Sequence, residues 1–320
     1  MTDKIQLGYA CINMELSSRP KKERVTTNRS MIKRTFKAKG IEYASELAEL
    51  NTRDILPILV WNHKHDIKVF RLSSCLFPWA SEYKLSSLPD YDKICDNLVN
   101  AGAYARENGI RLSFHPGPFN ILSSNKDHVV ENSIKDLSTH GEIFDIMGMP
   151  RSRCAKINIH IGASYGDRKS AMERFCKNFK RLPESVQSRL TTENDDRANL
   201  FSTKDLYYGV YKKVGTPIVF DYHHHKFRGS DQTEQEALEL AIDTWGDIIP
   251  TCHYSESACL KEGKQKVKNA HSDYIYDRIE NYNHRLDIVI EAKAKENALF
   301  KYRKDWQNGC KINNTGTFAA

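Results

Sequence analysis

Short apolar runs recur along the whole chain, and their length and residue types are those of buried β-strands. The run TPIVF, which directly precedes Asp221, is rich in β-branched residues. Eight such runs cover residues 5–11, 67–75, 110–116, 156–162, 189–195, 216–221, 248–254 and 285–293. The pattern therefore predicts eight strands spread over nearly the full length of the chain.

Between these runs, apolar residues recur at three- and four-residue intervals, which is the period of an α-helix. The predicted helices cover residues 28–64, 90–107, 127–147, 168–182, 203–213, 233–245 and 271–281. Ser202 and Thr203 are candidate N-caps, and Gly109 closes the helix over 90–107. This alternation favours an α/β fold, a single-domain (β/α)8 TIM barrel, over an open doubly wound sheet. The chain has no GxGxxG or Walker-type loop, which weakens the open-sheet alternative further.

We expect the barrel domain to cover residues 1–305 and residues 306–320 to form a flexible C-terminal tail. The chain is 40% hydrophobic, enough for one full core, and no apolar run approaches the length of a membrane span. The N-terminus lacks the apolar stretch of a signal peptide, and the eight cysteines include no CxxC pair. These features predict a cytoplasmic protein with reduced thiols, associated with the nucleoid if the source is prokaryotic.

Six of the eight predicted strands end in His, Asp or Glu. These residues are His115, His160, Glu193, Asp221, His253 and Glu291. The stretch FDYHHHKF at 220–227 adds His224, and His271 lies between the last two strands. In a (β/α)8 barrel the C-terminal ends of all strands meet on one face, where such enzymes keep their chemistry. We therefore expect these side chains to share one pocket.

Five imidazoles and three carboxylates exceed the number that one metal ion needs. They suit two or three divalent ions, with a carboxylate such as Glu193 bridging them. Mixed nitrogen and oxygen ligation favours Zn²⁺ or Mn²⁺ over Mg²⁺ or Ca²⁺. Two ions about 3.5–4 Å apart suit phosphodiester hydrolysis. Each residue alone is more often structural than a ligand, but eight at or near strand ends are hard to explain in that way.

Basic residues are concentrated in two segments that each follow a predicted strand. Nine Lys and Arg residues stand between positions 19 and 39 against the single acid Glu23, and a second basic loop covers 261–268. We take Lys21, Lys22 and Arg24 as candidate DNA contacts, since basic residues on the catalytic rim neutralise phosphates. A solvated helix face is the alternative, but the adjacent anionic cluster favours nucleic acid.

Nine motifs make the chain resemble the UV damage endonuclease family, which is similar in fold and metal cluster to endonuclease IV. They are LGYACIN (7–13), FRLSS (70–74), SFHPG (113–117), HIGASYGDR (160–168), ENDDR (193–197), DYHHH (221–225), HYSES (253–257), AHSDY (270–274) and IEAKAKE (290–296). The resemblance implies a repair enzyme that nicks double-stranded DNA immediately 5′ to UV photoproducts, leaving a 3′-hydroxyl and a 5′-phosphate. It also implies action on some abasic and other distorting lesions, with Mn²⁺ as the usual cofactor and Zn²⁺ as the alternative.

The same resemblance assigns site residues by motif. All eight candidate ligands above match metal-binding positions of the family. Tyr9 and Asn13 match active-site residues that contact the DNA near the scissile phosphate, and with Glu193 and His253 they form the expected catalytic set. Nothing in the sequence identifies a protein partner.

The chain departs from the family pattern at three places. Cys75 stands where bacterial relatives carry a His, and Thr251 stands where relatives carry a Lys that is often described as carbamylated. Pro118 and Phe119 replace the Gln and Tyr that probe the lesion, and we expect Phe119 to fill that role by shape and stacking. These departures leave a catalytically inert damage-binding protein as one alternative. The alternatives among enzymes are an endonuclease IV-like apurinic endonuclease and a xylose isomerase-like sugar enzyme, although a sugar enzyme would have little use for the basic rim.

Overall fold

The computed structural model describes residues 4–229, 231–264 and 267–308. Its eight strands are β1 (Ile5–Ala10), β2 (Val69–Arg71), β3 (Arg111–Ser113), β4 (Ile157–His160), β5 (Leu190–Glu193), β6 (Ile218–Asp221), β7 (Thr251–Tyr254) and β8 (Leu286–Ile290). All paired strands are parallel, in the order β3-β2-β1-β8-β7-β6-β5-β4. A parallel bridge between Phe114 and Ile157 joins β3 to β4. The strands therefore close into a barrel, and the predicted single-domain TIM barrel is confirmed.

The strands are buried almost throughout, as their apolar sequence requires. Every residue of β5, β6, β7 and β8 is buried. Fully burying one Val, Leu, Ile or Phe side chain stabilises the folded state by about 1.5–3 kcal/mol. Gly8 allows β1 and β2 to approach closely, because an added Cβ would lie 2.2 Å from the Val69 carbonyl oxygen. Because all paired strands are parallel, their C-terminal ends lie on one face of the barrel.

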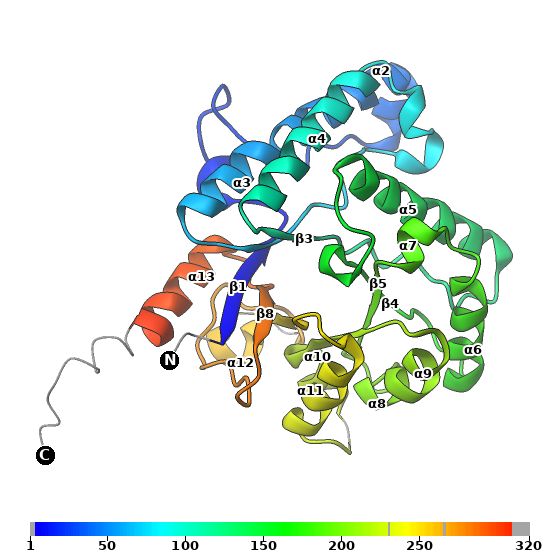
Figure 1. The fold of residues 1–320 in the computed structure, drawn as a ribbon, viewed down its shortest axis with the longest axis vertical. Helices are drawn as coiled ribbons and strands as arrows, with labels where there is room; N and C mark the ends of the chain where they lie inside the picture. Colours follow the sequence, from blue (N-terminus) through cyan, green and yellow to red (C-terminus); the bar gives the residue numbers. More distant parts are fainter. Residues whose placement is uncertain (1–3, 230, 265–266, 309–320) are drawn as a thin grey trace, which may run out of the picture.

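Helices surround the strands (Figure 1), with α2–α4 in blue to cyan at the top and α5–α7 in green on the right. The longer helices are α2 (Lys33–Arg53), α3 (Ile55–Lys64), α4 (Tyr91–Glu107), α5 (Asp127–Ile146), α6 (Arg168–Phe179), α11 (Glu234–Ile242), α10 (Tyr222–Arg228) and α13 (Glu296–Tyr302). Shorter ones are α1 (Met14–Ser17), α7 (Glu184–Gln187), α8 (Thr203–Leu206), α9 (Lys212–Val214) and α12 (Ala258–Glu262). Single 3₁₀ turns are η1 (Ala80–Glu82), η2 (Leu85–Ser87), η3 (Arg153–Ala155) and η5 (Asp243–Trp245), and π-helical turns are η4 (Tyr207–Tyr211) and η6 (Arg303–Asn308).

Most predicted helices form, with corrected boundaries. The helix expected over 28–64 begins at Lys33 and divides into α2 and α3 at Asp54. Ser202 caps α8 through a reciprocal pair of hydrogen bonds with Asp205, which is a capping box. The three histidines that follow the predicted strand over 216–221 lie in α10, whose first turn is capped by the Asp221 carboxylate, which accepts the backbone N–H of His224 at 2.7 Å.

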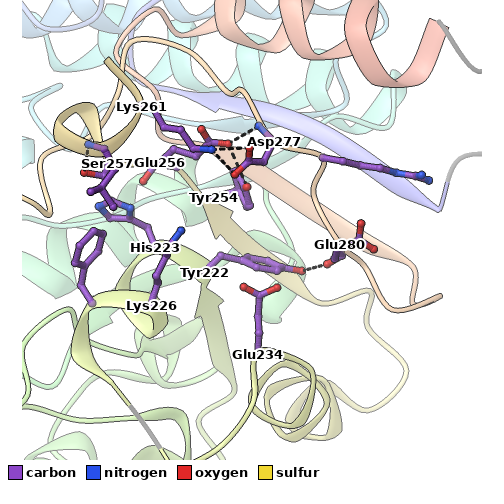
Figure 2. Close-up of a pocket in the computed structure, with 14 residues that line it drawn as sticks. Tyr222, His223, Lys226, Glu234, Tyr254, Glu256, Ser257, Lys261, Asp277 and Glu280 are labelled. Carbon is purple, nitrogen blue, oxygen red and sulfur yellow. Dashed lines mark hydrogen bonds and ion pairs between the residues drawn. The ribbon is translucent and has the colours of Figure 1, made fainter. Parts of the chain in front are cut away.

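The prediction of a helix over residues 271–281 is wrong, because the described residues between α12 and β8 form no helix. Side chains from other elements take up the backbone N–H groups that a helix would use. The Glu256 carboxylate accepts those of Tyr276 and Asp277, the latter at 2.8 Å, and the Tyr302 hydroxyl accepts that of Ile279 at 3.0 Å. Figure 2 shows this contact region, where Lys261 also pairs with Asp277. The segment is therefore an irregular loop that is hydrogen-bonded to the loop after β7 and to α13.

The described helices include none that is both long and apolar enough to cross a membrane. At the C-terminus, the π-helical turn η6 continues from α13 as far as Asn308. Residues 306–308 of the predicted tail thus belong to this turn, and residues 309–320 lie outside the described part. The boundary at 305 stays a prediction.

Candidate metal centre

Seven of the eight predicted ligands meet at the C-terminal ends of the strands. The register of the sheet pairs His160 with Glu193 and Asp221 with His253. His115 follows β3, Glu291 follows β8, and His224 lies in the first turn of α10. Because all these elements end on one face of the barrel, residues far apart in sequence form one cluster.

The cluster contains three groups of donor atoms, and within each group the atoms lie within 4.8 Å of one another. The groups are His115–Glu193–His253, His160–Glu193–His224 and Asp221–His253–Glu291. Glu193 belongs to the first two groups, and His253 belongs to the first and third. This sharing suits a centre that holds more than one cation.

Glu193 lies at the middle of the cluster and divides its two oxygens between neighbours. Its Oε2 is 3.1 Å from His115 Nε2 and 3.0 Å from His253 Nδ1. Its Oε1 is 3.2 Å from His224 Nδ1 and 3.8 Å from His160 Nε2. A carboxylate placed in this way can face two cations at once, as a bridging ligand must.

Several polar atoms of the cluster are buried without a hydrogen-bond partner in the described part of the chain. They include Asp221 Oδ2 and His253 Nε2. Buried polar atoms are nearly always satisfied, so orphaned ones call for a specific explanation. Carboxylate oxygens and imidazole nitrogens are ligands for Mn²⁺ and Zn²⁺, and bound divalent ions would satisfy these atoms.

The ionisation of the cluster agrees with this role. Burial raises the pKa of Glu193, but the imidazoles of His253 and His160 outweigh burial and hold that pKa well below its usual value. Burial lowers the pKa of His253 to about 4, so its ring is neutral at pH 7 and has a lone pair to donate. Burial lowers the pKa of His160, but Glu193 and Asp195 more than compensate and raise it to about 9, so a cation bound by this ring would displace its proton. Burial also raises the pKa of Asp221, a carboxyl that a bound cation would ionise.

An open groove of about 840 Å³ lies over the cluster. Its floor includes His115, His160, His224 and Glu291, and its walls come from the loops after β3, β4 and β5. Pro118 of the first loop and Arg197 of the third line it. The donor groups therefore stand at the bottom of a surface that an extended polymer can reach.

His271 and Cys75 lie outside the three donor groups. The His271 ring centroid is 5.2 Å from that of His223, and its Nδ1 is buried without a hydrogen-bond partner. Cys75 is exposed and lines a separate cavity of about 230 Å³. Thr251 is buried on β7, and its hydroxyl has no hydrogen-bond partner. The assignment of His271 as a ligand stays a prediction.

Tyr9 on β1 and Asn13, which follows the strand, are buried and bonded to each other. Asn13 Nδ2 donates to the Tyr9 hydroxyl at 2.9 Å, and that hydroxyl donates to Asn62 Oδ1 at 2.6 Å. Burial raises the pKa of Tyr9. Neither residue is among those that line the groove, so their role as DNA contacts stays a prediction.

The predicted DNA contacts lie on the surface. Phe119 is 86% exposed at the loop after β3, next to Pro118. Lys21, Lys22 and Arg24 are exposed in the connection between α1 and α2. Exposure makes all of them accessible to DNA, and their function stays a prediction.

The sequence analysis missed three residues that support the ligands. Asn158 Nδ2 donates to Glu193, and Asn158 Oδ1 accepts a hydrogen bond from Thr191 Oγ1 at 2.8 Å. Arg71 forms an ion pair with Glu291, and Asp195 Oδ1 is 3.0 Å from His160 Nδ1. Two signals were available. Asn158 precedes His160 by two residues and therefore shares its face of the strand, and Asp195 follows Glu193 by two.

Fold and site together define a (β/α)8 barrel protein with a candidate centre for several cations in a groove on its C-terminal face. The family model for UV-endonuclease UvdE matches residues 5–319. The chain therefore belongs to the UV damage endonuclease family, and the resemblance seen in the sequence is confirmed.

Similar proteins cover most of the chain. A UV-damage endonuclease of Schizosaccharomyces pombe is 33% identical over 305 residues, which are 92% of this chain but only 50% of that protein. A UV DNA damage endonuclease of Bacillus cereus strain G9842 is 35% identical over 262 residues, 78% of this chain and 79% of that one. The crystal structure of SacUVDE superposes with a TM-score of 0.81 at 30% identity, covering 95% of this chain and 98% of that chain.

Proposed function

We propose that this protein is a DNA repair endonuclease that cuts the phosphodiester bond immediately 5′ to UV photoproducts and leaves a 3′-hydroxyl and a 5′-phosphate. Its substrate is double-stranded DNA carrying such lesions, and abasic or other distorting lesions extend the range. The proposed location is the cytoplasm, at the nucleoid if the source is prokaryotic. The observation that carries the proposal is the position of buried Glu193, which is shared by two donor groups whose members His115, His160 and His224 line an open groove.

The donor set fits two or three divalent ions, with Mn²⁺ as the first choice and Zn²⁺ as the alternative. His115, His160, Glu193, Asp221, His224, His253 and Glu291 would hold them, with His271 as an additional candidate. When bound, such ions lower the pKa of water and stabilise charge on phosphate oxygens, which is the chemistry of phosphodiester hydrolysis.

The chain's own residues prepare the site for this reaction. Asn158 fixes the orientation of Glu193, and Asp195 fixes that of His160, so two ligands are positioned before DNA binds. Arg71 holds Glu291 by an ion pair and also lines the groove, where its guanidinium can bind a phosphate. In this proposal, exposed Lys21, Lys22 and Arg24 add phosphate contacts and Tyr9 and Asn13 act near the scissile bond.

The test is to incubate the purified protein and Mn²⁺ with a duplex carrying one defined photoproduct, and to map the cut and its end groups. We expect one nick immediately 5′ to the lesion and none in the matched undamaged duplex. A duplex with one abasic site tests the apurinic alternative. Cutting of the abasic duplex alone would favour that alternative, and lesion binding without any cutting would favour the inert binder.

A further inference from the structure

Tyr165 is an exposed aromatic residue in the groove that the reaction above leaves without a role. It lies in the loop between β4 and α6, lines the groove with Pro118 and His160, and is 44% exposed. A large ring that stays in contact with water is not part of the core. Its position a few residues beyond a predicted ligand places it where DNA would enter.

The ring is held in place at a cost to the backbone. Tyr165 has φ of +52°, a left-handed conformation that non-glycine residues adopt rarely and that clusters at ligand-binding sites. Its hydroxyl donates to Ser124 Oγ at 3.3 Å. The Arg174 guanidinium lies 5.5 Å from the ring centroid, and Arg174 is itself anchored to the Ser123 carbonyl at 2.7 Å. The loop therefore fixes an aromatic surface toward the groove before any ligand binds.

We infer that Tyr165 is a DNA-positioning residue whose ring stacks on the base of a nucleotide drawn out of the duplex. The inference rests on the proposed function. Enzymes that act at damaged bases extrude them, and extrusion is easiest where stacking is already poor. Aromatic rings accept any base, since every base has a π-face. The groove volume of about 840 Å³ lies within the usual size range of ligand pockets, about 300–1,000 Å³.

This role differs from that of Phe119. Phe119 stands on the neighbouring loop, is almost fully exposed, and is not among the residues that line the groove. It can fill the gap left in the duplex, whereas Tyr165 can hold the base that has left. Stacking at Tyr165 would then stabilise the extruded state, which damaged DNA reaches at a lower cost than intact DNA does.

The experiment compares wild type with Tyr165→Phe, which keeps the ring, and Tyr165→Leu, which removes it. Nicking of the photoproduct duplex and fluorescence of a 2-aminopurine beside the lesion are measured for each. We expect Tyr165→Leu to lose roughly 10-fold in nicking of damaged DNA and to lose the fluorescence rise on binding, while Tyr165→Phe keeps both. Tyr208→Leu is the matched control, since Tyr208 is 61% exposed and is not among the residues that line the groove.

Failure of this inference can be told apart from failure of the proposed function. If wild type does not nick the damaged duplex, the proposed function is overturned, and this inference falls with it. If wild type nicks and Tyr165→Leu nicks equally well, only the inference about Tyr165 is overturned. Equal losses in the Phe and Leu variants would also overturn it, because the hydroxyl bond to Ser124 would then carry the effect.

Discussion

Lys156 is a buried amine directly below the candidate metal centre. It precedes β4, shares the inward face with Asn158, is 1% exposed, and has an Nζ without a hydrogen-bond partner. Burial and the nearby charges of Arg111 and Arg71 lower its pKa to about 7. Between pH 7 and 10.5 the unfolded chain therefore binds more protons at this residue than the folded protein does. The stability of the fold should rise with pH across that window.

Replacing Lys156 by Met tests this directly. Without added metal, Lys156→Met should be more stable than wild type at pH 7, by up to a few kcal/mol, because no amine has to lose its proton. The difference should shrink toward pH 10. Urea unfolding at both pH values measures it, with Lys180→Met on the exposed end of α6 as the control. The same pH dependence in wild type and Lys156→Met would show that Lys156 does not titrate near neutrality.

Among single residues, the sequence indicated the predicted metal ligands more clearly than the residues that hold those ligands in place. An acid or imidazole at the end of an apolar run, as at Glu193 or His160, stands out because the strand pattern fixes where it points. Lys156 and Asn158 lie within or beside the same run, and the period of two places them on the face of His160 without showing which groups they contact. Their partners come from other strands, so only the closed barrel shows what they contact.

Among the elements, the segment between α1 and α2 carries the basic residues that we propose contact DNA. Changing Lys21, Lys22 and Arg24 to Gln should weaken binding to damaged and intact duplexes alike, because phosphate contacts carry no sequence information. The slope of log affinity against log salt should flatten by roughly one for each lost phosphate contact. The control variant changes Lys169 and Lys177 on α6 and Lys180 at its C-cap to Gln, which removes the same charge from another surface. An unchanged slope in the first variant would place the segment away from the DNA.

The loop between β3 and α5 carries Phe119, the proposed lesion probe. Phe119→Ala should lower nicking of the photoproduct duplex by roughly 10- to 100-fold, the equivalent of about 1–3 kcal/mol of stacking. Metal content and thermal stability should not change, because the side chain is 86% exposed. Leu260→Ala on α12 removes a similarly exposed apolar side chain elsewhere and should have no effect. Wild-type nicking by Phe119→Ala would mean that another residue enters the duplex.

Elements were predictable where local pattern and tertiary structure agree. The strands and most helices formed as expected, since their apolar periodicity matches the faces that the barrel buries. The segment 271–281 has the same periodicity but no helix, because Glu256 and Tyr302 bind its backbone N–H groups. Such competition comes from residues distant in sequence, so local spacing could not reveal it.

For the whole molecule, closure of the barrel turns scattered residues into one site. The bridge between β3 and β4 brings His115 beside ligands that follow it by up to 176 residues, which no local pattern measures. β6 separates β5 from β7 in the sheet, so Glu193 Oε2 and His253 Nδ1 come within 3.0 Å of each other across the barrel interior. The central claim is therefore that Glu193 joins two donor groups into a single multi-cation centre.

Metal content of Glu193→Gln tests that claim most directly. Gln keeps the shape of the side chain but removes the charge that can hold two cations together. After dialysis with Mn²⁺, we expect wild type to retain two or three ions per chain and Glu193→Gln to lose nearly all of them, together with nicking of the photoproduct duplex. Glu256→Gln, at a buried carboxylate outside the three donor groups, should retain the wild-type ion content. Wild-type metal content and turnover in Glu193→Gln would contradict the claim and remove Glu193 from the centre.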